Sequence, residues 1–514
     1  MRASGPGQIC RQNLKLVRVR KAPFRHGRFR MKKVLLGVAL IVLILVGIVL
    51  IRTARLTSTS HLAFHDTEIN LQTHAIADRL AQAIQYKTIS GKDSVSSNEE
   101  FLRFHHFLKA AFPLVHIKLA REVVGGHSLL FTWKGRNPLL RPMLLMGHID
   151  VVPVDPSTER NWTYPPFAGR IADGYIWGRG ALDDKASVLG MLEAVEHLLA
   201  EAFQPERTVY LAFGHDEEVG GNMGAAAIAE LLESRQLQLE YVLDEGGYIT
   251  EGIIPDVDRP VAMVGIAEKG YVSVELVVEA AGGHSSMPPN PTAIGVLSRA
   301  IHKLENSPFP SRIVMPTQKF LERVGAGMDL VRAIMTANLW LFDPLIRREM
   351  DKSPWSRAMI RTTQAPTVFE AGVTDNVLPG KARAIINFRV LTGETIADVL
   401  AHVKKTIDDP AVRITPLSTQ IEPSAISDMN SASFKPIEVA IGATFPGTII
   451  APSLLIAATD SRHYTQLTNN TYRFMPIALR ADDTQRFHGI DERVSIRDYE
   501  NAVRFFVQLL RNSN

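Results

Sequence analysis

Five clusters of histidine and acidic residues are the groups in this 514-residue chain that could do chemistry. The first cluster is His148 and Asp150, in the segment GHIDVVP. Because the two residues lie two apart at the expected end of a strand, both side chains point to the same side. His148 could then bind a metal ion while Asp150 orients it through a hydrogen bond. A core histidine bonded to a nearby carboxylate would give the same pattern.

The second cluster is Asp183 and Asp184, in the segment GRGALDDKAS. It follows a glycine-rich turn and precedes a segment of helical periodicity, so one of these residues could simply cap a helix. A carboxylate also has two oxygens that can bridge two cations, which a neutral imidazole cannot do. Both interpretations fit this cluster when it is taken alone.

The next two clusters are pairs of acids that follow strongly apolar runs. Glu217 and Glu218 end the segment TVYLAFGHDEE, and Asp244 and Glu245 follow YVL. Adjacent residues at a strand end point in different directions. One acid of a pair can therefore bind a metal while its neighbour reaches a metal-bound water. A solvated loop face is the ordinary alternative for such tandem acids.

The fifth cluster is His488, in RFHGIDERVS, which lies 340 residues after His148 and alone would be a loop histidine. All five clusters fall at the ends of apolar runs within one predicted sheet, which favours a single shared site for two metal ions. The one cysteine, Cys10, precedes every segment that could fold, so the ligands must be imidazoles and carboxylates. This ligand set suits Zn²⁺, with Co²⁺ or Mn²⁺ as substitutes.

The apolar runs that carry these clusters alternate with segments of helical periodicity. PMLLMGHID, TVYLAFGHDEE and YVLDEGG are typical of buried strands, whereas residues 69–86 and 192–203 have apolar residues at helical spacing. The alternation predicts an α/β fold with a mixed, mostly parallel sheet and helices on both faces. Ligands in such sheets bind where strands end.

The pattern changes at about Glu268. The segments VSVELVVEA and ARAIINFRV alternate apolar and polar residues with period two, and an amphipathic helix follows each. This predicts a smaller α+β lid or dimerisation domain with an antiparallel sheet. We place this domain at residues 268–392, where it interrupts a catalytic domain made of residues 67–267 and 393–514.

Residues 310–365 form an apolar and aromatic insertion, which includes NLWLFDPLI and whose role the sequence leaves open. The insertion could line an apolar acyl channel or form ordinary core. The side chains concerned are Phe320, Leu339, Trp340, Leu341 and Phe342.

The N-terminal region differs from the rest of the chain. Residues 1–33 contain eleven Lys or Arg and no acid, and residues 34–51 are eighteen uncharged residues. As a helix of about 27 Å, residues 34–51 would nearly span a ~30 Å hydrocarbon core, which predicts a transmembrane signal anchor followed by a stem at 52–66. The basic excess places residues 1–33 in the cytoplasm and the catalytic domain on the extracytoplasmic side, periplasmic or extracellular.

Three alternatives remain open for this region. The apolar segment could be a buried core helix, or cleavage after it could give a secreted form. Met31 could also be the true start of translation.

Composition excludes several classes of protein. With 46% apolar and 21% charged residues, the chain resembles an ordinary globular protein rather than a low-complexity or multi-span membrane protein. Beyond residue 33 it has 46 basic and 53 acidic residues, a net charge of −7. Because nucleic-acid binding depends on neutralising phosphates, we expect no nucleic-acid partner.

The ordered series GHIDVVP, GRGALDDK, DEEVGG, DEGG, GGHSS and HG resembles the di-zinc metallopeptidases that include aminoacylase, glutamate carboxypeptidase and succinyl-diaminopimelate desuccinylase. The resemblance covers about residues 67–512. Within that family, the segments VLDEGG, AEKGYVSVEL, GGHSSMPP, TDSRHY and HGIDERVS are most similar to carboxypeptidase S and the N-fatty-acyl-amino-acid synthase/hydrolase. Ala186 departs from the glycine that many relatives have after the lysine, but it removes no ligand.

The resemblance implies a role for each site residue. It makes Asp183 the bridge between two zinc ions, with one acid of the DEGG segment, Glu245 or alternatively Asp244, completing the first ligand set. The implied ligands are His148, Asp183, Glu218, Glu245 or Asp244, and His488.

The resemblance also implies roles around the metals. Asp150 orients the first histidine and Glu217 is the general base. In the lid, His284 polarises the scissile carbonyl, often across a dimer in relatives, while Asn376 and Arg389 hold the substrate's carboxylate.

These features predict a zinc-dependent metallohydrolase that uses a metal-activated water. It would cleave the amide bond of a C-terminal amino acid in small peptides or N-acyl amino acids with a free carboxylate. The resemblance adds a homodimer formed through the lid. A catalytically inactive, membrane-tethered binding protein on the same fold is the alternative, which a missing ligand would favour, and none is missing. A single-metal aminopeptidase would leave the bridging Asp183 without a role.

Overall fold

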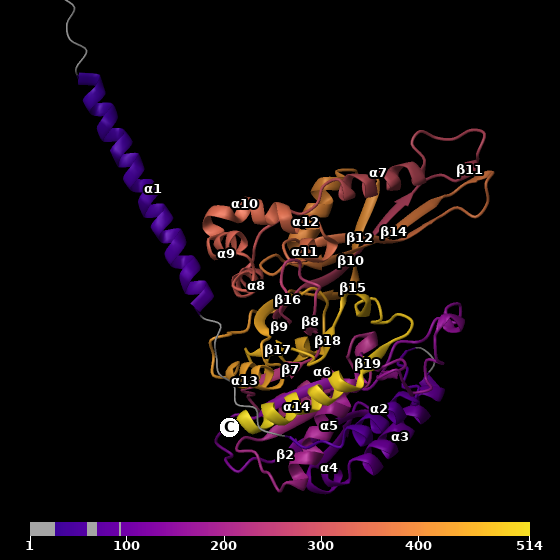
Figure 1. Ribbon diagram of the computed structural model, residues 1–514. Coiled ribbons are helices and arrows are strands. Elements are labelled where there is room, and N and C mark those ends of the chain that lie inside the picture. Colours follow the sequence, from indigo (N-terminus) through magenta and orange to yellow (C-terminus); the bar gives the residue numbers. More distant parts are fainter. Residues whose placement is uncertain (1–25, 59–68, 92–93, 514) are drawn as a thin grey trace, which may run out of the picture. The chain divides into compact units, whose positions relative to one another are not determined.

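The computed structural model describes residues 26–58, 69–91 and 94–513 (Figure 1). The chain divides into two compact units, residues 1–52 and 53–514. Helix α1 (His26–Ser58) contains the strongly apolar segment Lys33–Leu56, which has the length and composition needed to cross a membrane. A signal sequence near an N-terminus has the same properties. Residues 1–25 of the predicted basic segment and 59–66 of the predicted stem lie outside the described residues.

A ten-stranded mixed sheet organises the larger unit in the part of the chain that the structure describes. The order is β1-β2-β6-β3-β7-β17-β9-β8-β18, with β16 also paired to β9, and the central strands β6, β3, β7 and β17 are parallel. This confirms the predicted mixed α/β fold. The strands are β1 (Ala120–Val124), β2 (Ser128–Trp133), β3 (Met143–His148), β6 (Val209–Gly214), β7 (Tyr241–Asp244), β8 (Ile249–Thr250), β9 (Val261–Glu268), β16 (Ile449–Leu455), β17 (Thr471–Arg473) and β18 (Ala478–Leu479).

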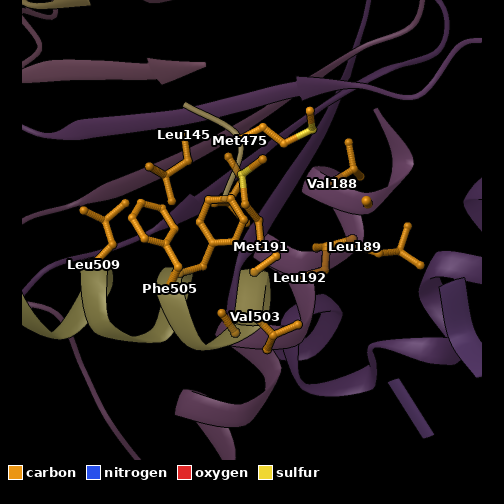
Figure 2. Packing of buried hydrophobic residues seen from close by; sticks show 14 of the residues in the cluster. Leu145, Val188, Leu189, Met191, Leu192, Met475, Val503, Phe505 and Leu509 are labelled. Carbon is orange, nitrogen blue, oxygen red and sulfur yellow. The ribbon is translucent and has the colours of Figure 1, made fainter. Parts of the chain in front are cut away.

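Helices cover both faces of this sheet because its central strands are apolar on both sides. All six residues of β3 are buried. Leu145 joins the core under one set of helices, whereas Leu144 and Met146 join the core on the other face. Figure 2 shows Leu145 packed with side chains of two helices on the first face. The covering helices are α2 (Thr73–Ile84), α5 (Lys185–Ala200), α13 (Lys435–Thr444) and α14 (Ile496–Asn512) on that face, and α6 (Ala225–Ser234) on the other.

Shorter elements complete this region of the fold. A three-stranded antiparallel sheet has the order β19-β5-β4. In it, β19 from the C-terminal region pairs with β5, which precedes Asp183 in the sequence. These elements are α3 (Ser94–Ala111), α4 (Pro113–Lys118), β4 (Arg170–Ala172), β5 (Tyr175–Trp177), β19 (Arg493–Ser495) and the 3₁₀ helices η1 (Glu159–Asn161), η2 (Glu217–Val219), η3 (Asp460–Tyr464) and η4 (Ala481–Asp483).

The predicted antiparallel sheet is present, with the order β12-β14-β10-β15. It packs against two amphipathic helices through a separate hydrophobic core. The sheet continues beyond residue 392, where we expected the smaller domain to end, because β15 pairs with β10 along most of its length. The elements are β10 (Gly270–Glu279), β12 (Thr363–Ala371), β14 (Lys381–Val390), β15 (Val412–Ile421), α7 (Ala293–Glu305) and α12 (Ile396–Ile407).

A two-stranded ribbon extends from this smaller sheet (Figure 1). It consists of β11 (Gly283–His284) and β13 (Val377–Leu378), which pair antiparallel. Both residues of β11 are exposed.

The apolar insertion forms four helices that pack on the large sheet. Phe320 and Ile346 are buried with Val261 of β9 and Ile449 of β16 in one hydrophobic cluster. Leu339 and Phe342 pack against the same cluster, so these side chains are ordinary core. The helices are α8 (Met315–Gly325), α9 (Leu330–Ala337), α10 (Leu339–Met350) and α11 (Pro354–Ala358).

Candidate functional site

The site forms where parallel strands of the large sheet end. His148 is the last residue of β3, Asp244 is the last residue of β7, and η2 follows β6. Because β6, β3 and β7 are neighbours and parallel, their carboxyl ends meet at one edge of the sheet. Asp183 reaches the same edge from the residue before the N-cap of α5.

The carboxylate of Asp183 lies between two imidazoles. Its Oδ1 is 2.9 Å from Nε2 of His148, and its Oδ2 is 3.1 Å from Nε2 of His488. A glutamate accompanies each imidazole: Glu245 Oε1 lies 3.6 Å from His148 Nε2, and Glu218 Oε2 lies 3.3 Å from His488 Nε2. The side chains thus form two groups of three that share Asp183.

The acids next to Asp183 and Glu245 in the sequence accept hydrogen bonds from backbone N–H groups. Asp244 accepts the backbone N–H of Ser461 and that of Glu245, each at 2.9 Å, so each of its oxygens already accepts a backbone hydrogen bond. Asp184 accepts the backbone N–H of His148 at 3.3 Å and forms no capping hydrogen bond with α5. The geometry therefore favours Glu245 over Asp244 as the acid that faces His148.

Asp150 connects the first histidine to the loop of the two glutamates. Its Oδ1 lies 3.3 Å from Nδ1 of His148. Its two oxygens accept the backbone N–H groups of Glu217 and Glu218, each at 3.2 Å, and Ser90 donates its hydroxyl to the same carboxylate. A single buried side chain thereby fixes both the imidazole and the loop.

The loop that carries Glu217 turns on two glycines with left-handed backbone conformations, Gly220 at φ 110° and Gly221 at φ 65°. A Cβ at Gly221 would lie 1.9 Å from Oδ1 of Asp460, so the loop needs glycine for space as well as for conformation. The segment DEEVGG shows the two glycines, but nothing in the sequence identifies Asp460 as their neighbour.

Sequence reasoning also missed a buried ion pair that joins the loops of Asp183 and His488. Arg179 donates to Glu492 at 2.6 Å and to the backbone oxygen of His488 at 3.1 Å. Glu492 Oε1 in turn accepts the backbone N–H of Asp183 at 3.1 Å, and those of Gly180 and Leu182. The sequence indicated this ion pair only in that the segments GRGALDDK and HGIDERVS both contain charged residues.

The cluster has more acids than bases. Burial raises the pKa of Glu217 and of Glu245 well above the ordinary value. Burial works against protonation of His148, but Glu245, Asp150 and Asp183 outweigh it and raise its pKa. Hydrogen bonds to Asp183 and Glu218 raise the pKa of His488 to about 10. Divalent cations would supply the positive charge that this arrangement lacks.

The donor atoms fit such cations. One group of atoms within 4.8 Å of each other comes from His148, Asp183 and Glu218, and a second comes from His148, Asp184 and Glu245. Glu218 Oε1 is buried and has no hydrogen-bond partner among the described residues. Imidazole nitrogen and carboxylate oxygen are ligands that zinc accepts.

A cavity of about 340 Å³ opens beside the acids. Asp183, Glu217, Glu218, Glu245 and His488 line one side of it. The rest is largely apolar, with side chains of Tyr248, Met263, Trp355, Leu455, Met475 and Phe487. Trp355 is the residue of the helical insertion that lines this cavity, and none of the five side chains considered for an acyl channel does so in the described part of the chain.

The three residues expected to contact substrate from the smaller domain lie elsewhere. His284 is on the exposed ribbon, where its neighbour Ser285 donates a backbone hydrogen bond to Asn376 at 3.2 Å. Arg389 is on β14, with its guanidinium 4.8 Å from the ring centre of Tyr271. The structure brings His284 and Asn376 together, but neither they nor Arg389 are among the described residues that line the cavity.

A family model of peptidase family M20/M25/M40 matches residues 144–512, which include every residue of the two groups. The chain belongs to this family. Membership confirms the resemblance seen in the ordered motifs and supports a hydrolase of the metallopeptidase type.

Curated M20 relatives match most of the chain. It is 44% identical over 453 residues to the probable carboxypeptidase S-like 2 of Dictyostelium discoideum, covering 87% of each chain. It is 41% identical over 445 residues to the N-fatty-acyl-amino acid synthase/hydrolase PM20D1 of Mus musculus, covering 86% of this chain and 88% of that one. Carboxypeptidase S of Saccharomyces cerevisiae is 30% identical over 502 residues, with 88% and 85% covered.

Solved M20 structures share the fold. The M20 family metallo-carboxypeptidase Sso-CP2 from Sulfolobus solfataricus has a TM-score of 0.63 at 19% identity, covering 85% of this chain and 98% of that one. The YXEP protein of Bacillus subtilis, described as a dinuclear metal-binding peptidase, has a TM-score of 0.53 at 14% identity with the same coverage.

Proposed function

We propose that this M20 chain is a hydrolase with two Zn²⁺ ions, for which Co²⁺ or Mn²⁺ can substitute. It cleaves the amide bond of a C-terminal amino acid in small peptides or N-acyl amino acids that have a free carboxylate. The observation that carries the proposal is the carboxylate of Asp183, which offers one oxygen to His148 and the other to His488. A carboxylate in this position is suited to bridge two cations.

The proposed ligands form two sets that share Asp183. The first set adds His148 and Glu245, and the second adds His488 and Glu218. The buried oxygen of Glu218 that has no hydrogen-bond partner among the described residues supports its assignment as a ligand. Asp150 keeps the ring of His148 oriented by the contact at Nδ1.

Bound cations would lower the pKa of a water from 15.7 towards ~7 and polarise the substrate carbonyl. Glu217 is the proposed general base. It lines the cavity beside the ligands, Asp150 holds its backbone, and burial raises the pKa of its carboxyl. A carboxylate at this position can take the proton of the attacking water and return it to the leaving nitrogen.

The smaller domain supplies the proposed contacts to the rest of the substrate. Arg389 and Asn376 hold its carboxylate, and His284 polarises the scissile carbonyl. Because His284 lies on an exposed ribbon and does not line the cavity of its own chain, we propose that it acts in the site of a second copy, in a homodimer formed through the lid.

The apolar side of the cavity supports an acyl chain or an apolar amino-acid side chain as the group that binds there. The relatives include both a carboxypeptidase S and an N-fatty-acyl-amino acid synthase/hydrolase. We further propose that α1 anchors the enzyme in a membrane with the catalytic domain on the extracytoplasmic side. Cleavage of the anchor would give a secreted form.

Metal titration tests the core of this proposal. Apo protein, as the full chain in detergent, should regain hydrolysis of an N-acyl amino acid with increasing Zn²⁺ and reach its maximum at two equivalents per chain. A maximum at one equivalent, or activity that is independent of added metal, would contradict the two-metal site.

Matched substrates test the carboxylate contact. A free-acid N-acyl amino acid should be cleaved better than its amide, and Arg389→Lys should raise KM for the free acid because lysine cannot form the two-pronged pair. Equal cleavage of the acid and the amide would remove Arg389 from the proposal.

A further inference from the structure

Two helices of the apolar insertion expose large apolar side chains to solvent. These side chains are Leu330 (69% exposed), Val331 (66%), Trp340 (50%), Leu341 (49%) and Leu345 (56%). The first two begin α9 and the others belong to α10, the next helix along the chain, which lies beside α9 in Figure 1. We call these five residues the α9–α10 face.

The exposed residues of α10 lie on one side of the helix. At 3.6 residues per turn, Trp340, Leu341 and Leu345 fall within one arc of the surface. The opposite side is already packed, since Ile346 and Met350 are buried in the core cluster beneath the helix. The outward side chains of α10 are therefore not part of this core, and soluble proteins seldom expose several large apolar side chains close together.

The residues around the patch are typical of a membrane–water interface. Tryptophan and leucine are enriched where protein meets the headgroup region. Arg348 is exposed on the same side of α10, one turn after Leu345, and forms no ion pair with another described residue. Its guanidinium could contact lipid phosphate while the apolar residues enter the interface.

The length of the chain between α1 and the body favours a lipid surface over a soluble partner. Helix α1 ends at Ser58 and the described body resumes at Ile69, a separation of at most about 40 Å. The unit of residues 53–514, which includes the end of α1, is expected to have a radius of gyration of about 23 Å. If α1 is anchored as proposed, this short connection keeps the body close to the bilayer. The bilayer surface therefore has a high effective concentration at the α9–α10 face.

We propose that the α9–α10 face docks on the lipid bilayer in which the chain is anchored. This inference rests on the membrane anchoring in the proposed function. In this arrangement, helices α9 and α10 of the insertion would lie in the membrane–water interface. Trp355 of the next helix, α11, lines the cavity beside the acids. Amides with long acyl chains, which partition into bilayers, would then reach the site from the membrane.

Site-specific fluorescence tests the docking with the full chain in phosphatidylcholine–phosphatidylglycerol vesicles. In a Cys10→Ser background, Leu341→Cys is labelled with an environment-sensitive dye. The matched control is Leu139→Cys, a 91% exposed leucine in the loop that follows β2. Strand β2 lies well away from α10 in Figure 1. Nitroxide-bearing lipids should quench the label at position 341 several-fold more than the label at 139, and aqueous iodide should do the reverse.

Two outcomes would overturn the proposal. Equal quenching at the two positions would show that the face is in solvent. Protection of position 341 from iodide without quenching by lipid nitroxides, growing with protein density, would show that a second copy covers it. The anchor is tested separately by extraction of the unlabelled full chain with alkaline carbonate. Release from the membrane would contradict the anchor, whereas the quenching experiment tests only the docking of the α9–α10 face.

A paired substitution gives an independent readout. Leu341→Asp with Leu345→Asp should leave turnover of a short-chain N-acyl amino acid in solution unchanged, since neither residue lines the cavity. Turnover of a long-chain N-acyl amino acid presented in vesicles should fall by about tenfold or more, because each charged side chain opposes burial in the interface. Unchanged turnover of both substrates would contradict the proposal.

Discussion

Glu492 accepts the backbone N–H of Asp183 at 3.1 Å although the two residues lie 309 positions apart. The same carboxylate pairs with Arg179, which in turn holds the backbone of His488. The loops of Asp183 and His488 are therefore connected twice. Their side chains approach each other in the site, and the Arg179–Glu492 pair forms hydrogen bonds to the backbone of both loops. The cluster depends on residues that touch none of the proposed metals.

Glu492→Ala is expected to destabilise the protein by about 3–5 kcal/mol, because it leaves the buried Arg179 without its partner. The thermal unfolding midpoint and the zinc content should both fall. The matched control is Glu349→Ala, which breaks an exposed pair with Lys352 and should change stability by less than about 1 kcal/mol. Similar midpoints for the two variants would contradict the structural role of Glu492.

Glu217→Ala should retain about two zinc ions per chain while turnover falls by roughly 10²–10⁴-fold, since general-base catalysis contributes about that much. Elemental analysis and initial rates on an N-acyl amino acid provide the measurement. Loss of both metals would instead make Glu217 a ligand, and near-normal turnover would remove it as the base.

Alanine substitutions at two glycines distinguish the effect of a steric clash with a neighbouring side chain from the effect of backbone strain. Gly221 and Gly252 have nearly the same left-handed conformation, with φ of 65° and 66°. A Cβ at Gly221 would meet Asp460 at 1.9 Å, whereas at Gly252 nothing lies within 4 Å. Both alanine variants should lose about 1–2 kcal/mol of stability from strain. Gly221→Ala alone should also displace the loop of Glu217 and lower zinc occupancy and turnover.

The pH dependence of stability should contain a contribution from His105. Burial lowers its pKa from 6.5 to about 4. Between these values the unfolded chain binds the proton and the folded protein does not, so stability is lost as pH falls from about 6.5 to 4. His105→Gln should reduce that loss by about 3 kcal/mol at pH 4, measured by denaturant unfolding. The exposed His74 provides the control, and an equal effect of His74→Gln would contradict the prediction.

Much of the candidate site could be predicted because its residues end apolar runs. Strand ends can be read from hydropathy, and parallel neighbours bring their ends to one edge of a sheet. The five clusters could therefore be grouped from the sequence, and the family resemblance selected single residues within them. The structure places His148, Asp183, Glu218 and His488 together.

The remaining choices depend on contacts between distant segments. Asp244 and Glu245 are adjacent acids at one strand end, and the difference between them comes from the backbone N–H of Ser461, 217 residues after Asp244. The pairing of β15 with β10, beyond residue 392, is also a long-range property. Likewise, the partner of Arg179 lies 313 residues away. Local sequence holds no signal for such pairings.

The approach of His488 to Asp183 has a consequence for biosynthesis. A ribosome that adds about 5–20 residues per second needs roughly 20–70 s to proceed from His148 to His488. During that interval the acids of the first strands are already made, but one imidazole and the buried glutamate that ties the loops do not yet exist. If the site holds two metal ions as proposed, the second ligand set is complete only after translation of the final segment, and a prematurely terminated chain that lacks His488 is expected to be inactive.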